Sequence, residues 1–271
     1  MRIVCLLENT QGHPLCEFEH GLSLYIETDS HRILSDAGQS DAVIRNAAVL
    51  GIDLTKLDSI FLSHGHYDHS GAILSLSEIA PNAQIYMQAG ALDQHVHGER
   101  DIGIDPKIAS LPNLCLLNGN LRIDGTLSVF SGVRGHRLDP VGNAGISRIL
   151  DGASVPDDFA HEQSLVVTDG GRNYLFSGCA HRGILNILDR YREIYGGDPC
   201  MAVTGFHMMK KEAPYTESEL ASIRETALEL KNTDTVFVTG HCTGDAAFAV
   251  MKEIMGDQLR RMRSGDKIKP F

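Results

Sequence analysis

Apolar residues recur along the chain in two different periods, which predict strands and helices in mixed order. Short or alternating apolar runs, typical of β-strands, lie at residues 3–7, 22–27, 32–35, 60–62, 84–87, 121–130, 164–168, 175–177, 202–204 and 235–238. Helical spacing covers residues 41–50, 71–79, 184–195, 216–230 and 246–254. A capping-box pattern from Thr216 to Glu219 opens the fourth helix, and Gly51 stands where the first would end. This mixture is typical of an α/β fold.

Two stretches have no clear period. Residues 98–112 are predicted to form an insert or lid near a site. Residues 134–158 are rich in Gly, Asp and Pro, and they are interpreted either as a long surface loop or as a wall of a substrate pocket. No linker or low-complexity segment divides the chain, so we expect one domain over residues 1–271.

Four of the predicted strands end in a small polar residue and are followed by a histidine. These histidines are His64, His181, His207 and His241. Ligand sites in α/β proteins gather beyond strand ends, so four parallel endings of this kind can converge on one pocket. A glycine after the strand permits a sharp turn at little steric cost.

The densest group of candidate ligands is the H-x-H-x-D-H motif formed by His64, His66, Asp68 and His69. Imidazole nitrogen and carboxylate oxygen suit zinc, iron or manganese. Side chains two apart in extended chain point the same way, so His64 and His66 can share an ion. Asp68 and His69 follow on a tighter bend and can face a second ion. The pattern differs from the zincin pair, in which two histidines four apart share a helix face.

Composition restricts the classes of function. The net charge of −11 argues against binding to nucleic acid or anionic membranes, both of which require a basic surface. An anionic small substrate is still compatible, because bound cations reverse the local field. The first apolar run is too short for a signal peptide, and no run approaches the ~20 residues that span a bilayer. With six cysteines and no C-x-x-C pair, we expect reduced thiols and a cytoplasmic protein.

The motif and its surroundings resemble the metallo-β-lactamase superfamily. Within it they are similar to the branch named for 7,8-dihydropterin-6-ylmethyl-4-(β-D-ribofuranosyl)aminobenzene-5′-phosphate synthase of methanopterin biosynthesis. The resemblance implies a four-layer αββα sandwich, with two mixed sheets flanked by helices. The matching segments occur in order at residues 19–23, 36–40, 63–71, 178–184, 205–207 and 240–244.

The same resemblance implies a metal-dependent hydrolase or transferase that acts on a small phosphorylated substrate. In the branch reaction, an arylamine displaces pyrophosphate from a dihydropterin-methyl diphosphate. The alternatives are a generic metal-dependent esterase or phosphoesterase, and a non-catalytic ligand sensor that keeps the fold. A homo-oligomer is compatible with each of these functions.

By position, the resemblance also implies two divalent cations, with zinc expected and iron, manganese or magnesium as alternatives. Asp68 would be catalytic as well as a ligand. Occupancy by one or two ions is left open. One cation would be held by His64, His66 and His181, and the other by Asp68, His69 and His241.

Other side chains are placed near the site by the resemblance. His207 is assigned to catalysis or substrate contact, with a plain structural role as the alternative, and His20 and Arg182 are assigned to substrate binding. Asp36 is expected to hold a metal-bound imidazole by a hydrogen bond. Further cations that could bind phosphate are Arg148, Lys210 and Lys211.

The chain departs from the family pattern in two places. Cys179 stands where many members carry a metal-bridging Asp, so no carboxylate bridges from that position. This cysteine is interpreted as a thiolate ligand, as a neighbour of the ligands, or as a small buried residue. The usual earlier His motif is also missing, and His161 competes with His181 for a ligand role.

Overall fold

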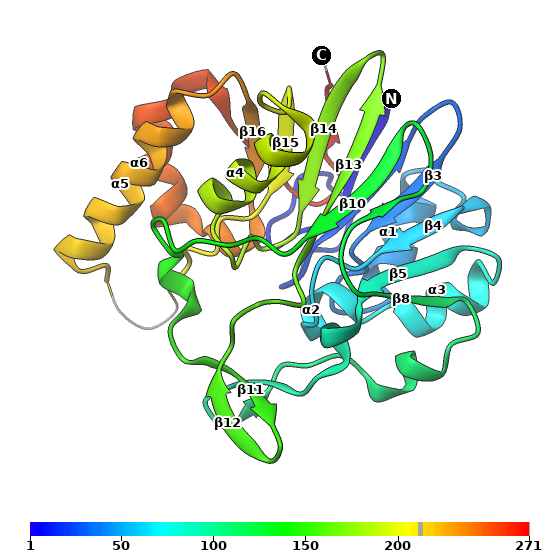
Figure 1. Cartoon of the computed structure of the whole chain (residues 1–271). Coiled ribbons are helices and arrows are strands. Elements are labelled where there is room, and N and C mark those ends of the chain that lie inside the picture. The colour runs from blue at the N-terminus through cyan, green and yellow to red at the C-terminus, as the bar shows by residue number, and fades with distance from the viewer. Residues whose placement is uncertain (211–213, 271) are drawn as a thin grey trace.

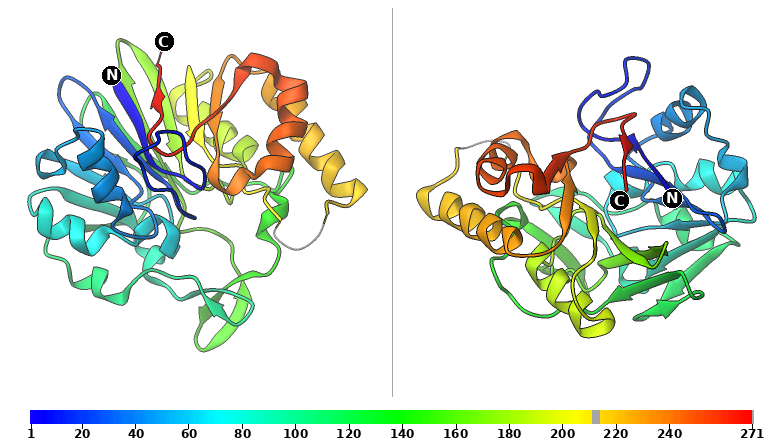
Figure 2. Two further views of the ribbon diagram at one scale, coloured as in Figure 1. Left: turned by 180° about the vertical axis from the view of Figure 1, so that it is seen from behind. Right: turned by 90° about the horizontal axis from the view of Figure 1, so that it is seen from above.

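The computed structural model describes residues 1–210 and 214–270 as a layered α/β molecule (Figure 1). Two β-sheets pack face to face, and helices cover the outer face of each (Figure 2). This arrangement confirms the predicted αββα sandwich. The two chain ends lie close together, because the last strand pairs with the first.

The first sheet is built mainly from the N-terminal half of the chain, in the order β18-β1-β2-β3-β4-β5-β8. The pairs from β18 to β3 are antiparallel, and the pairs from β3 to β8 are parallel. Its strands are β1 (Arg2–Leu7), β2 (Ser23–Glu27), β3 (Arg32–Ser35), β4 (Ser59–Phe61), β5 (Gln84–Gln88), β8 (Leu114–Leu117) and β18 (Lys267–Ile268).

The second sheet repeats this plan in the order β17-β16-β15-β14-β13-β10-β9. The pairs from β9 to β14 are antiparallel, and those from β14 to β17 are parallel. Its strands are β9 (Leu121–Arg122), β10 (Leu127–Ser131), β13 (Gln163–Asp169), β14 (Arg172–Ser177), β15 (Met201–Thr204), β16 (Val236–Thr239) and β17 (Leu259–Arg261).

Alternation along the strands separates the core into layers. In β1, Ile3 and Cys5 pack between the two sheets, whereas Val4 and Leu6 pack against the helices of the first sheet. Both faces of the strand are therefore buried. The helices α1 (Ala42–Val49) and α3 (Ile73–Ile79) cover the first sheet, and α4 (Ile184–Tyr195), α5 (Glu217–Lys231) and α6 (Asp245–Met255) cover the second.

The segment interpreted as a long surface loop or as a pocket wall contains a β-hairpin, which corrects the loop interpretation, and part of it lines a cavity. Residues 146–156 form β11 (Ile146–Leu150) and β12 (Ala153–Pro156), and β11 pairs with β6 (His95–His97). With β7 (Arg100–Asp101), these strands form a small antiparallel sheet, seen at the bottom of Figure 1. Weak periodicity hid the hairpin because most of its side chains are only partly buried.

The predicted strand at residues 121–130 is also wrong in part, because it is broken by a turn. Asp124 Oδ1 accepts hydrogen bonds from the amides of Thr126 (2.6 Å) and Leu127 (3.0 Å). A carboxylate that caps backbone amides in this way stabilises a turn over a continuous strand. Two antiparallel strands, β9 and β10, result.

The predicted insert at residues 98–112 contains β7 and a short 3-10 helix, Pro106–Ser110. Ile108 of that helix is buried in the core beside α3, so this end of the segment is anchored. The role of the segment as a lid stays a prediction. No helix among the described residues has both the length and the apolar character needed to cross a bilayer.

Candidate metal centre

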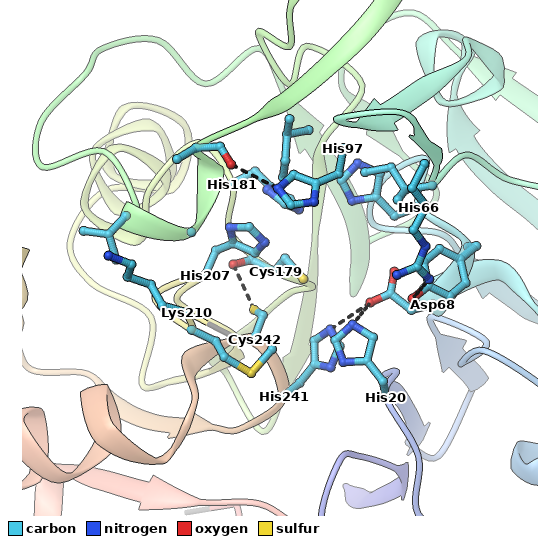
Figure 3. Close-up of a pocket in the computed structure, with 18 of the residues that line it drawn as sticks. His20, His66, Asp68, His97, Cys179, His181, His207, Lys210, His241 and Cys242 are labelled. Carbon is cyan, nitrogen blue, oxygen red and sulfur yellow. Dashed lines mark hydrogen bonds and ion pairs between the residues drawn. The ribbon is translucent and has the colours of Figure 1, made fainter. Parts of the chain in front are cut away.

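The predicted ligands are delivered at the carboxyl ends of strands from both sheets. After β4, the chain presents His64 and His66, and then the single-turn helix α2 (Tyr67–Ser70) carries Asp68 and His69. In the second sheet the parallel strands β14 and β16 end before His181 and His241 respectively. All six side chains are buried, and several face the common cavity drawn in Figure 3.

One group of donors surrounds His64. Its Nε2 atom lies 3.3 Å from Nε2 of His181. The ring of His66 lies 4.5 Å from the ring of His64 and 4.8 Å from that of His181, measured between centroids. The three histidines predicted to share a cation are therefore brought together.

A second group of donors surrounds His69. Its Nε2 atom lies 3.2 Å from Nε2 of His241, and Asp68 Oδ2 lies 3.3 Å from the same nitrogen of His241. Asp68 Oδ2 is also 3.8 Å from Nε2 of His69. This trio matches the second predicted set.

Cys179 belongs to both groups. Its Sγ atom lies 3.2 Å from Nε2 of His69. It forms one cluster of potential ligand atoms with His64 and His181, and another with His69 and His241, each within 4.8 Å. The sulfur thus occupies a shared position between the two groups.

Four of the imidazoles are held through Nδ1, which leaves Nε2 directed into the groups. A neutral imidazole has one N–H, so a hydrogen bond from Nδ1 to an oxygen leaves the Nε2 lone pair free. This arrangement is typical of metal-binding histidines. The oxygen partners are Asp36 for His69 (2.8 Å), Asn9 for His241 (2.8 Å), Asn143 for His181 (3.0 Å) and Ser63 for His64 (2.8 Å).

Asp36 has the position predicted for it. Its Oδ2 atom accepts from Nδ1 of His69 and, at 2.8 Å, from Oγ of Ser63, while Oδ1 accepts from the Ser63 amide at 2.7 Å. The residue is held in the left-handed region with φ of 61°. Gly178 packs so closely here that a Cβ atom would overlap Oγ of Ser63 and lie 2.9 Å from Asp36 Oδ2, so only glycine fits.

The donors fit divalent cations. Ligand atoms about 2.0–2.1 Å from a tetrahedral zinc lie about 3.3 Å from one another. The Nε2 pairs of His64 with His181 (3.3 Å) and of His69 with His241 (3.2 Å) have this separation. Imidazole, carboxylate and thiolate donors suit zinc or iron.

A cavity of ≈ 590 Å³ opens above these donors. His20 lines it, with Nε2 3.1 Å from Asp68 Oδ2. His207 lines it as well, its ring centroid 3.9 Å from that of His181. His207 also has a positive φ of 46°, and its buried Nδ1 has no hydrogen-bond partner among the described residues. Strain and an unpartnered polar atom are typical of functional positions.

Arg182 is a correction, because its side chain does not line the cavity. Its guanidinium donates to the carbonyl oxygens of Asp158 (2.9 Å) and Gly135 (3.1 Å), and these bonds join two loops. Arg148 likewise pairs with Asp158, at 3.1 Å. Lys210 does line the cavity, whereas Lys211 lies outside the described residues.

Comparison with known proteins identifies the family. A sequence model described as the metallo-beta-lactamase superfamily matches residues 17–241. The chain belongs to the metallo-β-lactamase superfamily. The resemblance seen in the motifs is thereby confirmed.

Two relatives and one structure with the same fold are similar to this chain. A 7,8-dihydropterin-6-methyl-4-(β-D-ribofuranosyl)-aminobenzene-5′-phosphate synthase of Methanocaldococcus jannaschii is 25% identical over 99% of this chain and 96% of the relative. The solved structure of Tm1679, described as a metal-dependent hydrolase of the superfamily, is 30% identical with a TM-score of 0.83, covering 100% of this chain and 99% of that one. Zn²⁺-bound PqqB of Methylobacterium extorquens shares the fold at 13% identity and a TM-score of 0.59, covering 100% of both chains.

Sequence reasoning missed several residues that hold the metallo-β-lactamase-type site in place. Asn9 lies two residues after the end of β1, so the strand-end pattern that revealed the histidines could have revealed it. Asn143 lies in an irregular stretch and gave no signal. Glu162 is buried, and its carboxylate accepts from the amides of His181 and Arg182 at 2.6 and 2.9 Å; burial raises its pKa to about 7.

Burial also sets the charge of the imidazoles when no cation is bound. It lowers the pKa of His64, His66 and His181 well below the usual value, and that of His207 to about 3. His69 is the exception. Burial acts to lower its pKa, but the carboxylates of Asp36 and Asp68 outweigh that effect and raise it to about 9.

We predict that the metal-free protein loses stability as the pH falls below about 6.5, the histidine pKa in unfolded chains. Histidines with a lowered pKa bind fewer protons in the folded state, so acid favours unfolding. The raised pKa of His69 adds stability that is fully present below pH 6.5 and is lost as the pH rises through about 9, but five histidines have a lowered pKa. Thermal melting of chelator-treated protein above and below that pH tests the prediction.

The variant His207→Asn should weaken this pH dependence, and His136→Asn, at an exposed histidine, should leave it unchanged. A melting temperature that is constant or higher in acid would contradict the prediction.

We also predict that Asp36→Asn lowers the affinity for divalent cations by about 10- to 100-fold, the range typical of residues that orient metal ligands. The amide cannot serve as a charged acceptor for both His69 and Ser63. Chelator competition measures the affinity. Asp41→Asn is the control, because Asp41 is exposed and its side chain makes no capping bond at α1. Equal affinities for both variants would remove Asp36 from the site.

Proposed function

We propose that this protein is a metal-dependent transferase or hydrolase that acts on a small phosphorylated substrate. The observation that carries the proposal is the pair of donor groups that share Cys179 beneath the ≈ 590 Å³ cavity. Membership in the superfamily and the name of the Methanocaldococcus relative support an enzyme. In its specific form, the reaction joins a dihydropterin-methyl diphosphate to a ribofuranosylaminobenzene phosphate and releases pyrophosphate.

The residues that would hold the cations are those already grouped. One cation would lie among His64, His66 and His181, and the other among Asp68, His69 and His241, with Cys179 as a sulfur donor between them. Bound divalent cations would act as Lewis acids and neutralise the charge of a departing diphosphate. Zinc is the expected ion, because the donors are mainly imidazole and thiolate.

The polar side chains of the cavity would bind and orient the substrate. Asp68 is ionised: burial acts to raise its pKa, but the His69 charge and hydrogen bonds from His20 and His241 lower it well below the usual value. His207 is neutral near pH 7 because burial lowers its pKa to about 3. It can therefore exchange a hydrogen bond or a proton with the attacking amine without placing a positive charge there.

Arg100 is the cation best placed to meet a phosphate. Lys210 also lines the cavity, but its Nζ atom lies 2.9 Å from both oxygens of Glu219 and is neutralised. Arg100 instead donates to the Tyr67 hydroxyl at 2.7 Å, with its guanidinium 4.9 Å from that ring. Among the described lysines and arginines of the cavity, Arg100 has no carboxylate partner, so its charge is available to an anion.

The deciding experiment incubates the metal-loaded protein with the pterin diphosphate and the arylamine phosphate, and measures pyrophosphate and the coupled product. Release of both supports the specific reaction. Pyrophosphate without coupled product, or turnover of other phosphoesters, favours a hydrolase. Cation and ligand binding without turnover on any substrate would favour a sensor and overturn the enzyme assignment.

We predict that Asp68→Ala abolishes turnover while the protein remains folded, because the variant lacks both a donor to one cation and the partner of His20. Turnover is measured by pyrophosphate release, and folding by circular dichroism. Asp29→Ala, at an exposed turn, is the matched control and should keep full activity. Retained turnover in Asp68→Ala would exclude the proposed role.

We predict that Arg100→Ala weakens the binding of inorganic pyrophosphate by about 10-fold, the loss expected for a partly exposed charged hydrogen bond. Arg100→Lys should restore part of the affinity, because the charge is kept but the two-pronged geometry is lost. Calorimetric titration of the metal-loaded protein gives the affinities. Arg148→Ala, on strand β11 of the same small sheet, is the control, and an equal loss in that variant would argue against a specific contact.

A further inference from the structure

A second cluster of titratable side chains lies behind His66, outside the two donor groups already described. It consists of His95, Asp157 and His161, all buried. Together with His66, each offers one potential ligand atom within 4.8 Å of the others. Neither the sequence motifs nor the proposed reaction accounts for this cluster.

Asp157 is its centre. Its Oδ1 atom accepts from the Phe159 amide at 2.7 Å, and its Oδ2 atom lies 2.7 Å from Nδ1 of His95 and 3.4 Å from Nε2 of His161. Burial acts to raise the pKa of Asp157, but hydrogen bonds from His161 and His95 lower it well below the usual value. The group is therefore a carboxylate that accepts a hydrogen bond from His95 and lies beside Nε2 of His161.

The tautomer of His161 excludes a third metal site. The Gly65 amide donates to Nδ1 of His161 at 2.9 Å, so Nδ1 bears a lone pair and no proton. The proton of the neutral ring is then on Nε2, which lies 3.4 Å from Asp157 Oδ2. A nitrogen that carries a proton cannot ligate a cation.

The same tautomer makes His161 a hydrogen-bond acceptor for the backbone of the metal motif. The Gly65 peptide lies between His64 and His66, so the bond from its amide fixes the backbone that presents both ligands. The site around Gly65 is tight, since a Cβ atom there would lie 2.6 Å from the Ala91 carbonyl oxygen and 3.0 Å from Nε2 of His95. Asp157 in turn holds the proton of His161 on the side away from Gly65.

His66 connects the cluster to the cavity. Its ring lines the cavity, but its Nε2 atom is buried and has no hydrogen-bond partner among the described residues. The ring centroids of His95 and His161 lie 5.6 and 5.8 Å from that of His66. The ring of His66 thus lies beside the cluster and also lines the cavity.

We propose that Asp157 and His161 are positioning residues that orient His66, and with it the cation subsite of His64, His66 and His181. This inference rests on the proposed function, because it concerns how one of the proposed cations is held. The subsite of Asp68, His69 and His241 is oriented by Asp36 and Asn9 instead. Asp36 also reaches His64 through the Ser63 hydroxyl, so the support from His161 and Asp157 is one that belongs to the first subsite alone.

The test measures the affinities of both subsites for Co²⁺ by chelator competition and follows the absorption spectrum of each bound ion. His161→Leu removes the acceptor of the Gly65 amide, and Asp157→Asn removes the carboxylate. Each should lower the Co²⁺ affinity of the subsite of His64, His66 and His181 by about 10- to 100-fold and change the spectrum of the ion there. The affinity of the other subsite should be retained. His161→Asn should restore part of the affinity, because its side-chain oxygen can accept from Gly65.

Asp158→Asn is the matched control. This residue adjoins Asp157 but is exposed and pairs with Arg148, so the variant should bind both ions normally. Wild-type affinity at both subsites in His161→Leu would overturn the proposal. So would a third equivalent of Co²⁺ that binds to the wild type and is lost in Asp157→Asn, since the cluster would then be a metal site.

A measurement that requires no cation separates this proposal from the proposed function. In the metal-free protein, the Gly65 amide should exchange slowly with solvent and show a ¹⁵N coupling to His161, and both features should disappear in His161→Leu. Their absence from the wild type would overturn the positioning role. A wild type that binds no cation but shows the coupling would overturn the proposed function instead. The hydrogen bond from the Gly65 amide to His161 would then still be confirmed.

Discussion

The orientation of the buried imidazoles through their Nδ1 atoms is the constraint on which the rest of the site depends. The Nε2 lone pairs of His64 and His181 lie 3.3 Å apart, repel one another and are shielded from water. Such an arrangement persists only where the surrounding structure fixes it. The fixing oxygens come from four separate segments, at residues 9, 36, 63 and 143, so the whole fold contributes.

Each donor group combines side chains from both sheets. His64 and His69 follow β4 of the first sheet, whereas His181 and His241 follow β14 and β16 of the second. A cation in either group would therefore tie the two halves of the sandwich together, and its binding would be linked to the stability of the folded state. Cys179, which follows β14, lies near ligand atoms of both groups, so a cation held by its sulfur would be tied to the second sheet as well.

Sequence alone predicted the fold class and the residues that meet in the centre, because strand ends followed by histidine are a local pattern. The sequence could not predict the tertiary hydrogen bonds that orient these side chains. The choice between His161 and His181 depends on which ring faces His64, and that is decided by the tertiary contacts of Gly65 and Asn143. Arg182 was predicted wrongly for the same reason, since its neighbour His181 is in the site while its own guanidinium bonds to loop carbonyls. Arg100 was missed because its segment has no periodicity.

The small sheet that sequence periodicity did not reveal joins these elements. Its strand β6 carries His95, β7 carries Arg100, and the chain leaving β12 carries Asp157. The same small sheet therefore supplies both the Arg100 guanidinium in the cavity and residues that support His66. Two bonds fix it to the metal motif: the Tyr67 amide donates to the Ile102 carbonyl at 3.0 Å, and Arg100 bonds to the Tyr67 hydroxyl. Because Tyr67 follows His66 directly, the position of an anion on Arg100 and the orientation of His66 are set by the same few contacts. A displacement of this sheet would therefore alter substrate binding and cation geometry together.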